Sequence, residues 1–181
     1  MKNLIFALLM LAVFTSCAKS QDSLFKDWSD VQYFYTAGPL PPPYHYSYDV
    51  AVNRNGVSIL TYRLGYETNK DPLTYNFNVC ADDLKLLEEK IVSSNLASGK
   101  IEAVPEGRHP IGGSLNKVRL ICTNPNPDLD QPPKMIESPY FPKDEYKENL
   151  QELYDFIKKL VPEDVWTDVK TKKEEFEKSM K

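Results

Sequence analysis

Two alternating stretches joined by Asn55-Gly56 constrain the fold of this chain most strongly. Residues 44–53 alternate between apolar and polar side chains, and residues 57–64 return with the same period. Such a two-residue period is typical of strands with one face in a core. Asn-Gly is the pair that a tight hairpin turn prefers, because both turn residues adopt a positive φ. The sequence therefore predicts a tight antiparallel hairpin that joins these two strands.

Further elements follow from the same patterns. We expect strands at 31–37, 73–80, 118–123 and 134–137, and a short edge strand with a loop within 99–114. Apolar residues at helical spacing predict helices at 82–95, at 144–160 and after Pro162, the last one fraying from Lys172. Strands with helices inserted and appended indicate an α+β fold. The expected domain is an antiparallel sheet of five to six strands covered by helices on one face, with two helices at the C-terminus.

The N-terminus has the pattern of a secretory signal peptide. Lys2 precedes an apolar run over residues 4–14, and small residues follow it. A helix that spans a membrane needs roughly 20 apolar residues, so this run is too short for a permanent span. We therefore assign residues 1–16 to a signal peptide.

The segment Phe14-Thr15-Ser16-Cys17 resembles the lipobox of bacterial lipoproteins, although Phe14 stands where leucine is usual. The resemblance implies that Cys17 is acylated and becomes the first mature residue. It also implies a palmitate-type lipid anchor that holds the protein to a bacterial membrane in the cell envelope, facing the periplasm or the exterior. The alternative is an ordinary signal peptide that ends beside an unmodified cysteine.

Behind this anchor we expect two segments. Residues 17–30 comprise the lipidated cysteine and a polar, flexible tether, and residues 31–181 form a single α+β domain. Without Lys2, which leaves with the signal peptide, 21 basic residues oppose 26 acidic ones. An acidic chain without basic patches argues against nucleic-acid binding, whose affinity comes largely from phosphate neutralisation.

Two cysteines, Cys80 and Cys122, remain in the domain. An even number in an oxidising compartment suggests a disulfide. Strand alternation places Cys80 among polar residues and Cys122 among apolar ones, and opposite faces of a sheet resist bridging. The alternatives are therefore a disulfide and two separate thiols.

Candidate catalytic and metal-binding groups are sparse. His45 shares the polar face of its expected strand with Ser47 and Asp49, but this spacing does not make side chains converge as a hydrolytic triad requires. The alternating oxygen ligands of residues 124–130 lack the glycine and glutamate of a calcium loop. We therefore expect no metal, no cofactor and no catalytic residue.

Tyrosines are concentrated on the first three expected strands, beside the proline-rich turn at 38–43. Alternation explains most of them as core packing, and Tyr44 is expected to be the exposed one. Tyr44 and His45 are the candidate interaction surface. The sequence favours a membrane-anchored, non-catalytic binding protein with an unidentified protein or envelope partner. The alternative is a small-molecule-binding protein or small hydrolase with a pocket near the proline-rich turn.

Overall fold

The computed structural model describes residues 27–66, 71–123 and 132–180. The signal peptide, Cys17 and most of the expected tether lie outside these residues, as does the segment weighed as a calcium loop. Within the described ranges, no helix is both long enough and apolar enough to cross a membrane.

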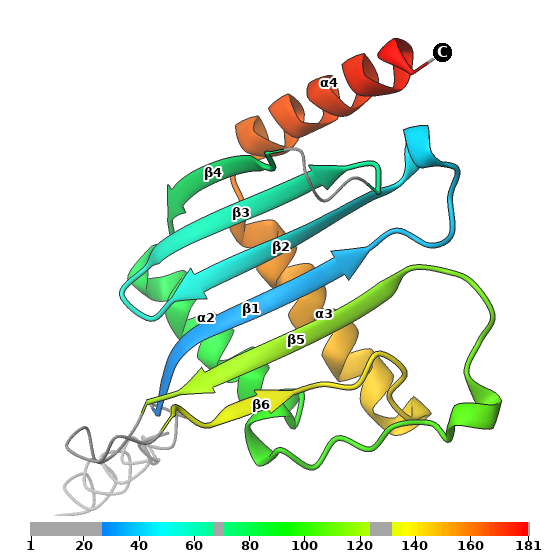
Figure 1. Cartoon of the computed structure of the whole chain (residues 1–181). Helices are drawn as coiled ribbons and strands as arrows, with labels where there is room; N and C mark the ends of the chain where they lie inside the picture. Colours follow the sequence, from blue (N-terminus) through cyan, green and yellow to red (C-terminus); the bar gives the residue numbers. More distant parts are fainter. Residues whose placement is uncertain (1–26, 67–70, 124–131, 181) are drawn as a thin grey trace, which may run out of the picture.

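Six antiparallel strands form one sheet in the order β4-β3-β2-β1-β5-β6 (Figure 1). Their bounds are Trp28–Thr36 (β1), Tyr46–Asn53 (β2), Val57–Leu64 (β3), Leu73–Asn78 (β4), Leu115–Cys122 (β5) and Met135–Glu137 (β6). The expected hairpin joins β2 to β3, and Gly56 at its turn has a φ of 90°. A Cβ atom at this position would lie 2.6 Å from the Val79 carbonyl oxygen, so only glycine fits.

Within the described ranges, three α-helices cover one face of this sheet, which confirms the predicted α+β architecture. They are α2 (Ala81–Ser93), α3 (Asp144–Leu160) and α4 (Glu163–Ser179). Figure 1 shows α2 and α3 behind the sheet, while α4 runs along its β3–β4 side. A break at Val161 and Pro162 separates α3 from α4 and lets the chain turn back over the sheet.

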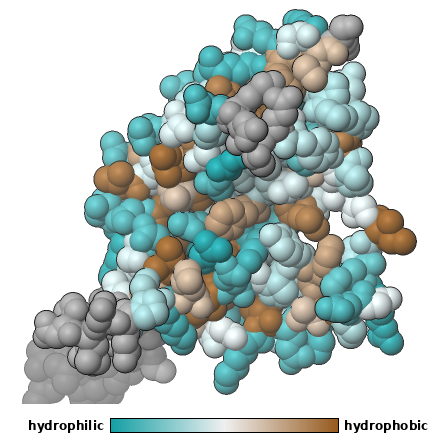
Figure 2. All heavy atoms as spheres, viewed as in Figure 1, coloured by the Kyte–Doolittle hydropathy of each residue, from teal (hydrophilic) through white to brown (hydrophobic). Residues whose placement is uncertain are grey.

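The core lies between this sheet face and the helices. Its fully buried side chains come from alternate strand positions and from one stripe of each of α2 and α3, as the periodicity predicts. They include Val31, Tyr33, Val50, Leu60, Leu120, Leu87, Ile91, Leu150, Leu153 and Ile157. The opposite sheet face carries no described helix, and Figure 2 shows it as a mixture of hydrophilic and hydrophobic residues.

The structure corrects three of the expected features in ways that matter for the domain. Residues 28–30 were assigned to the tether, but β1 begins at Trp28, whose ring is completely buried and donates from Nε1 to Glu88 Oε1 at 3.1 Å. The expected edge strand within 99–114 is absent from the described structure. Only an isolated bridge between Ala103 and Pro142 forms there, because the prolines at 105 and 110 lack the N–H that a ladder needs.

The third correction concerns the end of α4. The helix was expected to fray from Lys172, yet it continues to Ser179. Phe176 holds the second half in place, because its ring lies beside Gly65 at the end of β3; a Cβ on Gly65 would lie 3.3 Å from Phe176 Cζ. A tertiary contact thus compensates for a marginal helix sequence.

Candidate functional site

An aromatic groove of about 770 Å³ lies between the sheet and the α3–α4 junction. Tyr46, Tyr48 and Tyr62 form its floor. They come from the core face of β2 and β3, where Tyr48 pairs directly with Tyr62 across the two strands. Their rings are nearly parallel, at 4° between Tyr48 and Tyr62 and 10° between Tyr46 and Tyr62. We call this feature the tyrosine groove.

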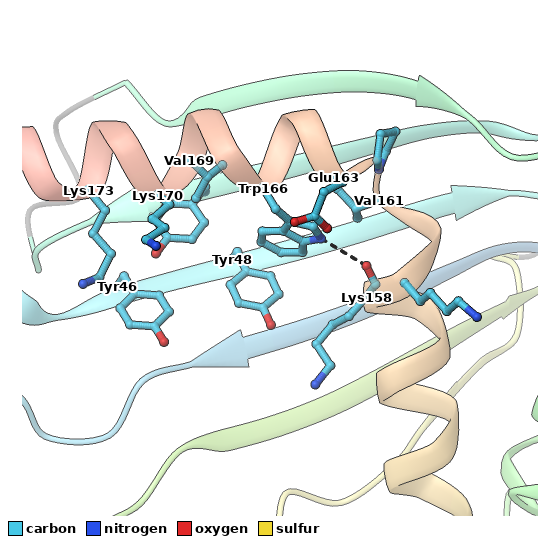
Figure 3. A pocket seen from close by; sticks show the side chains of 12 residues that line it. Tyr46, Tyr48, Lys158, Val161, Glu163, Trp166, Val169, Lys170 and Lys173 are labelled. Atoms are coloured by element: carbon cyan, nitrogen blue, oxygen red, sulfur yellow. Dashed lines mark hydrogen bonds between the residues drawn. The ribbon is translucent and has the colours of Figure 1, made fainter.

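Helix α4 supplies one wall of the tyrosine groove. Trp166 packs edge-on against Tyr48, with 5.3 Å between ring centroids, and Val169 is buried behind it. Figure 3 shows the indole held by the hydrogen bond that Nε1 donates to the Lys158 carbonyl oxygen, at 3.2 Å. This bond connects the last turn of α3 with the first turns of α4. It therefore fixes the wall where the chain changes direction.

Charged residues surround this aromatic surface. Besides Val161 and Pro162, the rest of the lining consists of four lysines and one carboxylate: Lys158, Lys159, Lys170, Lys173 and Glu163. In Figure 3, Lys170 and Lys173 reach from α4 towards Tyr46, while Lys158 lies beyond Trp166 at the other end. The Lys173 ammonium stands 5.3 Å from the centroid of the Tyr46 ring, within the range of a cation–π contact.

Burial makes the floor hydroxyls still harder to ionise than an ordinary tyrosine. Desolvation raises the pKa of Tyr62 and Tyr48 well above the ordinary tyrosine value; neighbouring tyrosines add to the shift at Tyr62, whereas the hydrogen bond with Tyr33 partly offsets it at Tyr48. Desolvation, together with the hydrogen bond to Tyr35, raises the pKa of Tyr46 to about 12. The floor is thus uncharged at neutral pH and only the rim carries charge. Such a surface can stack on flat or apolar groups and attract anions.

The residues proposed as an interaction surface lie beside this groove rather than in it. Tyr44 is exposed, at 40%, and ends the 3-10 turn Pro42–Tyr44, although Tyr66 and Tyr140 are more exposed. His45 was expected on a solvated strand face and is instead only 8% exposed, immediately before β2. Its ring stacks on Tyr66 at 3.8 Å between centroids. The pocket expected at the proline-rich turn is thus displaced to Tyr46 and the helices.

The structure does not bring His45, Ser47 and Asp49 together as a catalytic triad. Asp49 pairs with Arg63 at 2.6 Å on the open sheet face, and Ser47 lines the same face. His45 lies outside β2, and its Nδ1 has no hydrogen-bond partner. No hydrogen bond joins these three residues in the described structure, so the hydrolase alternative finds no support in their geometry.

The other histidine is structural. His109 Nε2 lies 2.9 Å from the Val104 carbonyl oxygen, and its ring packs against Phe141 at 4.6 Å between centroids. Among the described residues, no cluster of three or more histidine, cysteine or acidic side chains could hold a metal ion.

Both domain cysteines are free thiols. Cys80 is exposed and follows β4 at one edge of the sheet, whereas Cys122 is buried at the end of β5. Three strands separate β4 from β5. At about 4.8 Å per strand this separation far exceeds the roughly 7 Å between Cα atoms that a disulfide tolerates. The disulfide alternative is therefore wrong for this structure.

Sequence reasoning found the tyrosines but missed the groove. The alternation of β2 placed Tyr46 and Tyr48 on the core face, and the break at Pro162 was predicted, but no face was assigned to Tyr62 on β3. The missing signal was that α4 leaves a groove beside Tyr46 and Trp166, which are only partly buried, whereas Tyr48 and Tyr62 are almost completely buried. The tyrosines at core positions were the available hint, because aromatic side chains with polar tips often lie at the border between core and solvent.

No protein-family model matches this chain, and no curated protein is similar to it.

Proposed function

We propose that this chain is a lipid-anchored lipoprotein of the bacterial cell envelope, and that its domain binds a partner through the tyrosine groove without catalysing a reaction. The observation that carries the binding role is the composition of the groove. Neutral aromatic faces form the floor, and Trp166 and four lysines surround it. Tyrosine and tryptophan are the residues most often found at the energetic centre of protein interfaces.

The path of the chain is compatible with a groove that stays accessible when the protein is anchored by lipid. β1 enters the sheet at Trp28, at the end where Asp30 pairs with Asn53. The groove lies beside Tyr48, which pairs with Tyr35. Seven residues of strand advance about 23 Å, so the groove is far from the end that leads back to Cys17. A lipid on Cys17 would thus leave the groove accessible to a partner.

A photocrosslinking residue tests the binding role. Placed at Lys170 on the rim, it should give a discrete crosslinked product in intact cells. Placed at Lys85, exposed on α2 and outside the groove, it should not. Equal products from both positions, or a product from Lys85 alone, would contradict the groove as the contact surface.

Replacing Cys17 tests the anchor. Cys17→Ser removes the thiol that lipid attachment requires, so the protein should move from the membrane fraction to the soluble fraction and lose incorporation of labelled palmitate. Cys80→Ser is the matched control, because Cys80 is an exposed thiol of the domain and should be dispensable for anchoring. Retention of the Cys17→Ser protein in washed membranes would refute the lipoprotein assignment.

A further inference from the structure

The positive charges of the tyrosine groove are spread along its length. Lys158 and Lys159 belong to the last turn of α3, whereas Lys170 and Lys173 project from α4 beyond Trp166. At 1.5 Å per residue, α4 rises about 10 Å between Glu163 and Lys170 alone. The two sets of ammonium groups are therefore too far apart for a single carboxylate to contact both.

One cation at each end is available to a ligand. Lys158 pairs with Asp155, and Lys173 pairs with Glu177. Lys159 and Lys170 are exposed and form no ion pair with another described residue. The lining therefore presents an aromatic centre between two ammonium groups that no described carboxylate neutralises.

The charge of the rest of the chain also favours an acidic partner at this groove over the rest of the surface. The chain as a whole has a formal net charge of −4, so most of its surface repels an acidic partner. In the groove the sign reverses, because four lysines and a single carboxylate, Glu163, are among the described residues that line it. Local reversal of charge fixes where an acidic partner docks and in which register.

Resting on the binding role proposed above, we infer that the tyrosine groove binds an extended acidic segment of a partner protein. In this segment an aromatic or apolar side chain packs on Trp166 and the tyrosine floor, between two carboxylates that pair with Lys159 and Lys170. An extended chain advances about 3.3 Å per residue, so carboxylates four residues apart span about 13 Å. A compact small-molecule anion would reach only one end of the groove.

A series of blocked pentapeptides tests this inference on the full domain. The acidic peptide Glu-Gly-Phe-Gly-Glu is compared with versions that carry glutamine or lysine in place of both glutamates. Trp166 fluorescence reports binding, because the only other tryptophan, Trp28, is completely buried in the opposite part of the sheet. Two exposed ion pairs should make the acidic peptide bind about fivefold to tenfold tighter than the glutamine peptide. The lysine peptide should bind weakest.

Charge variants test whether Lys159 and Lys170 cause the preference for the acidic peptide. Lys159→Gln combined with Lys170→Gln should abolish the advantage of the acidic over the glutamine peptide. Lys85→Gln combined with Lys134→Gln removes the same charge from exposed positions outside the groove and should preserve that advantage.

Three outcomes would overturn the inference: equal binding of acidic and lysine peptides, equal loss in both double variants, or no response of Trp166 to the acidic peptide. The crosslinking comparison of Lys170 with Lys85 does not depend on ligand charge. A failed peptide series beside a successful crosslink would therefore reject the acidic segment and retain the groove.

Discussion

Raising the pH above about 10 is expected to unfold the domain steeply. Desolvation raises the pKa of Tyr33, Tyr48 and Tyr62 above the ordinary tyrosine value of 10.0. Their side chains are 0%, 7% and 3% exposed. Between the unfolded and folded pKa values the unfolded chain holds fewer protons than the folded one, so the free energy of unfolding falls as the pH rises.

The expected size of this effect is large. Each of the three groups contributes a loss of about 1.4 kcal/mol per pH unit, or about 4 kcal/mol per unit together. A domain with about 8 kcal/mol of stability at neutral pH would reach its unfolding midpoint near pH 12. Circular dichroism and tyrosinate absorbance, followed together, measure the transition. Below pH 10 the same groups have no influence on the slope.

Tyr62→Phe tests whether ionisation of the buried tyrosines causes the alkaline unfolding. It keeps the ring and removes one titrating hydroxyl, so the loss of unfolding free energy above pH 10 should become smaller by about 1.4 kcal/mol per pH unit. Tyr44→Phe is the matched control, because this ring is 40% exposed in the folded domain. An unchanged slope in the Tyr62→Phe protein would show that the buried tyrosines do not drive alkaline unfolding.

Replacing Trp28 with alanine is expected to lower the free energy of unfolding by about 3–5 kcal/mol, as is usual for a buried tryptophan. The ring is completely buried where β1 begins, and its Nε1 donates to Glu88 on α2. The change thus leaves a cavity and removes a contact between the sheet and a helix. Urea titration measures the loss.

Two comparisons decide whether Trp28 belongs to the domain or to the tether. Trp166→Ala should cost less, because Trp166 is only partly buried beside an open groove. A chain that starts at Val31 should be less stable than one that starts at Asp27 by an amount similar to the Trp28→Ala effect. Equal stability of these two chains would place Trp28 outside the core.

The sequence determined the elements that local patterns specify. Alternation and the Asn55-Gly56 turn predicted β2, β3 and their hairpin, because a period of two and a positive φ are properties of adjacent residues. The apolar stripe of residues 144–160 predicted α3 with its observed bounds. These features depend on neighbours in the chain, so a single sequence is sufficient to recognise them.

Only the tertiary structure decided which distant segments meet. β5 pairs with β1 rather than with β4, and this order separates Cys80 from Cys122. Trp28 looked like part of a polar tether until its contact with Glu88 on α2 was seen. Strand order depends on how whole faces pack, and no local pattern encodes it.

The tyrosine groove likewise depends partly on local sequence patterns and partly on tertiary packing. The sequence placed Tyr46 and Tyr48 on the core face of β2, but how far a helix covers them depends on the angle at which the chain leaves Val161. That angle is set by the hydrogen bond from Trp166 to Lys158 and by Phe176 packed beside Gly65. Residues about a hundred positions apart thus build the site, because packing across the core determines where α4 comes to rest.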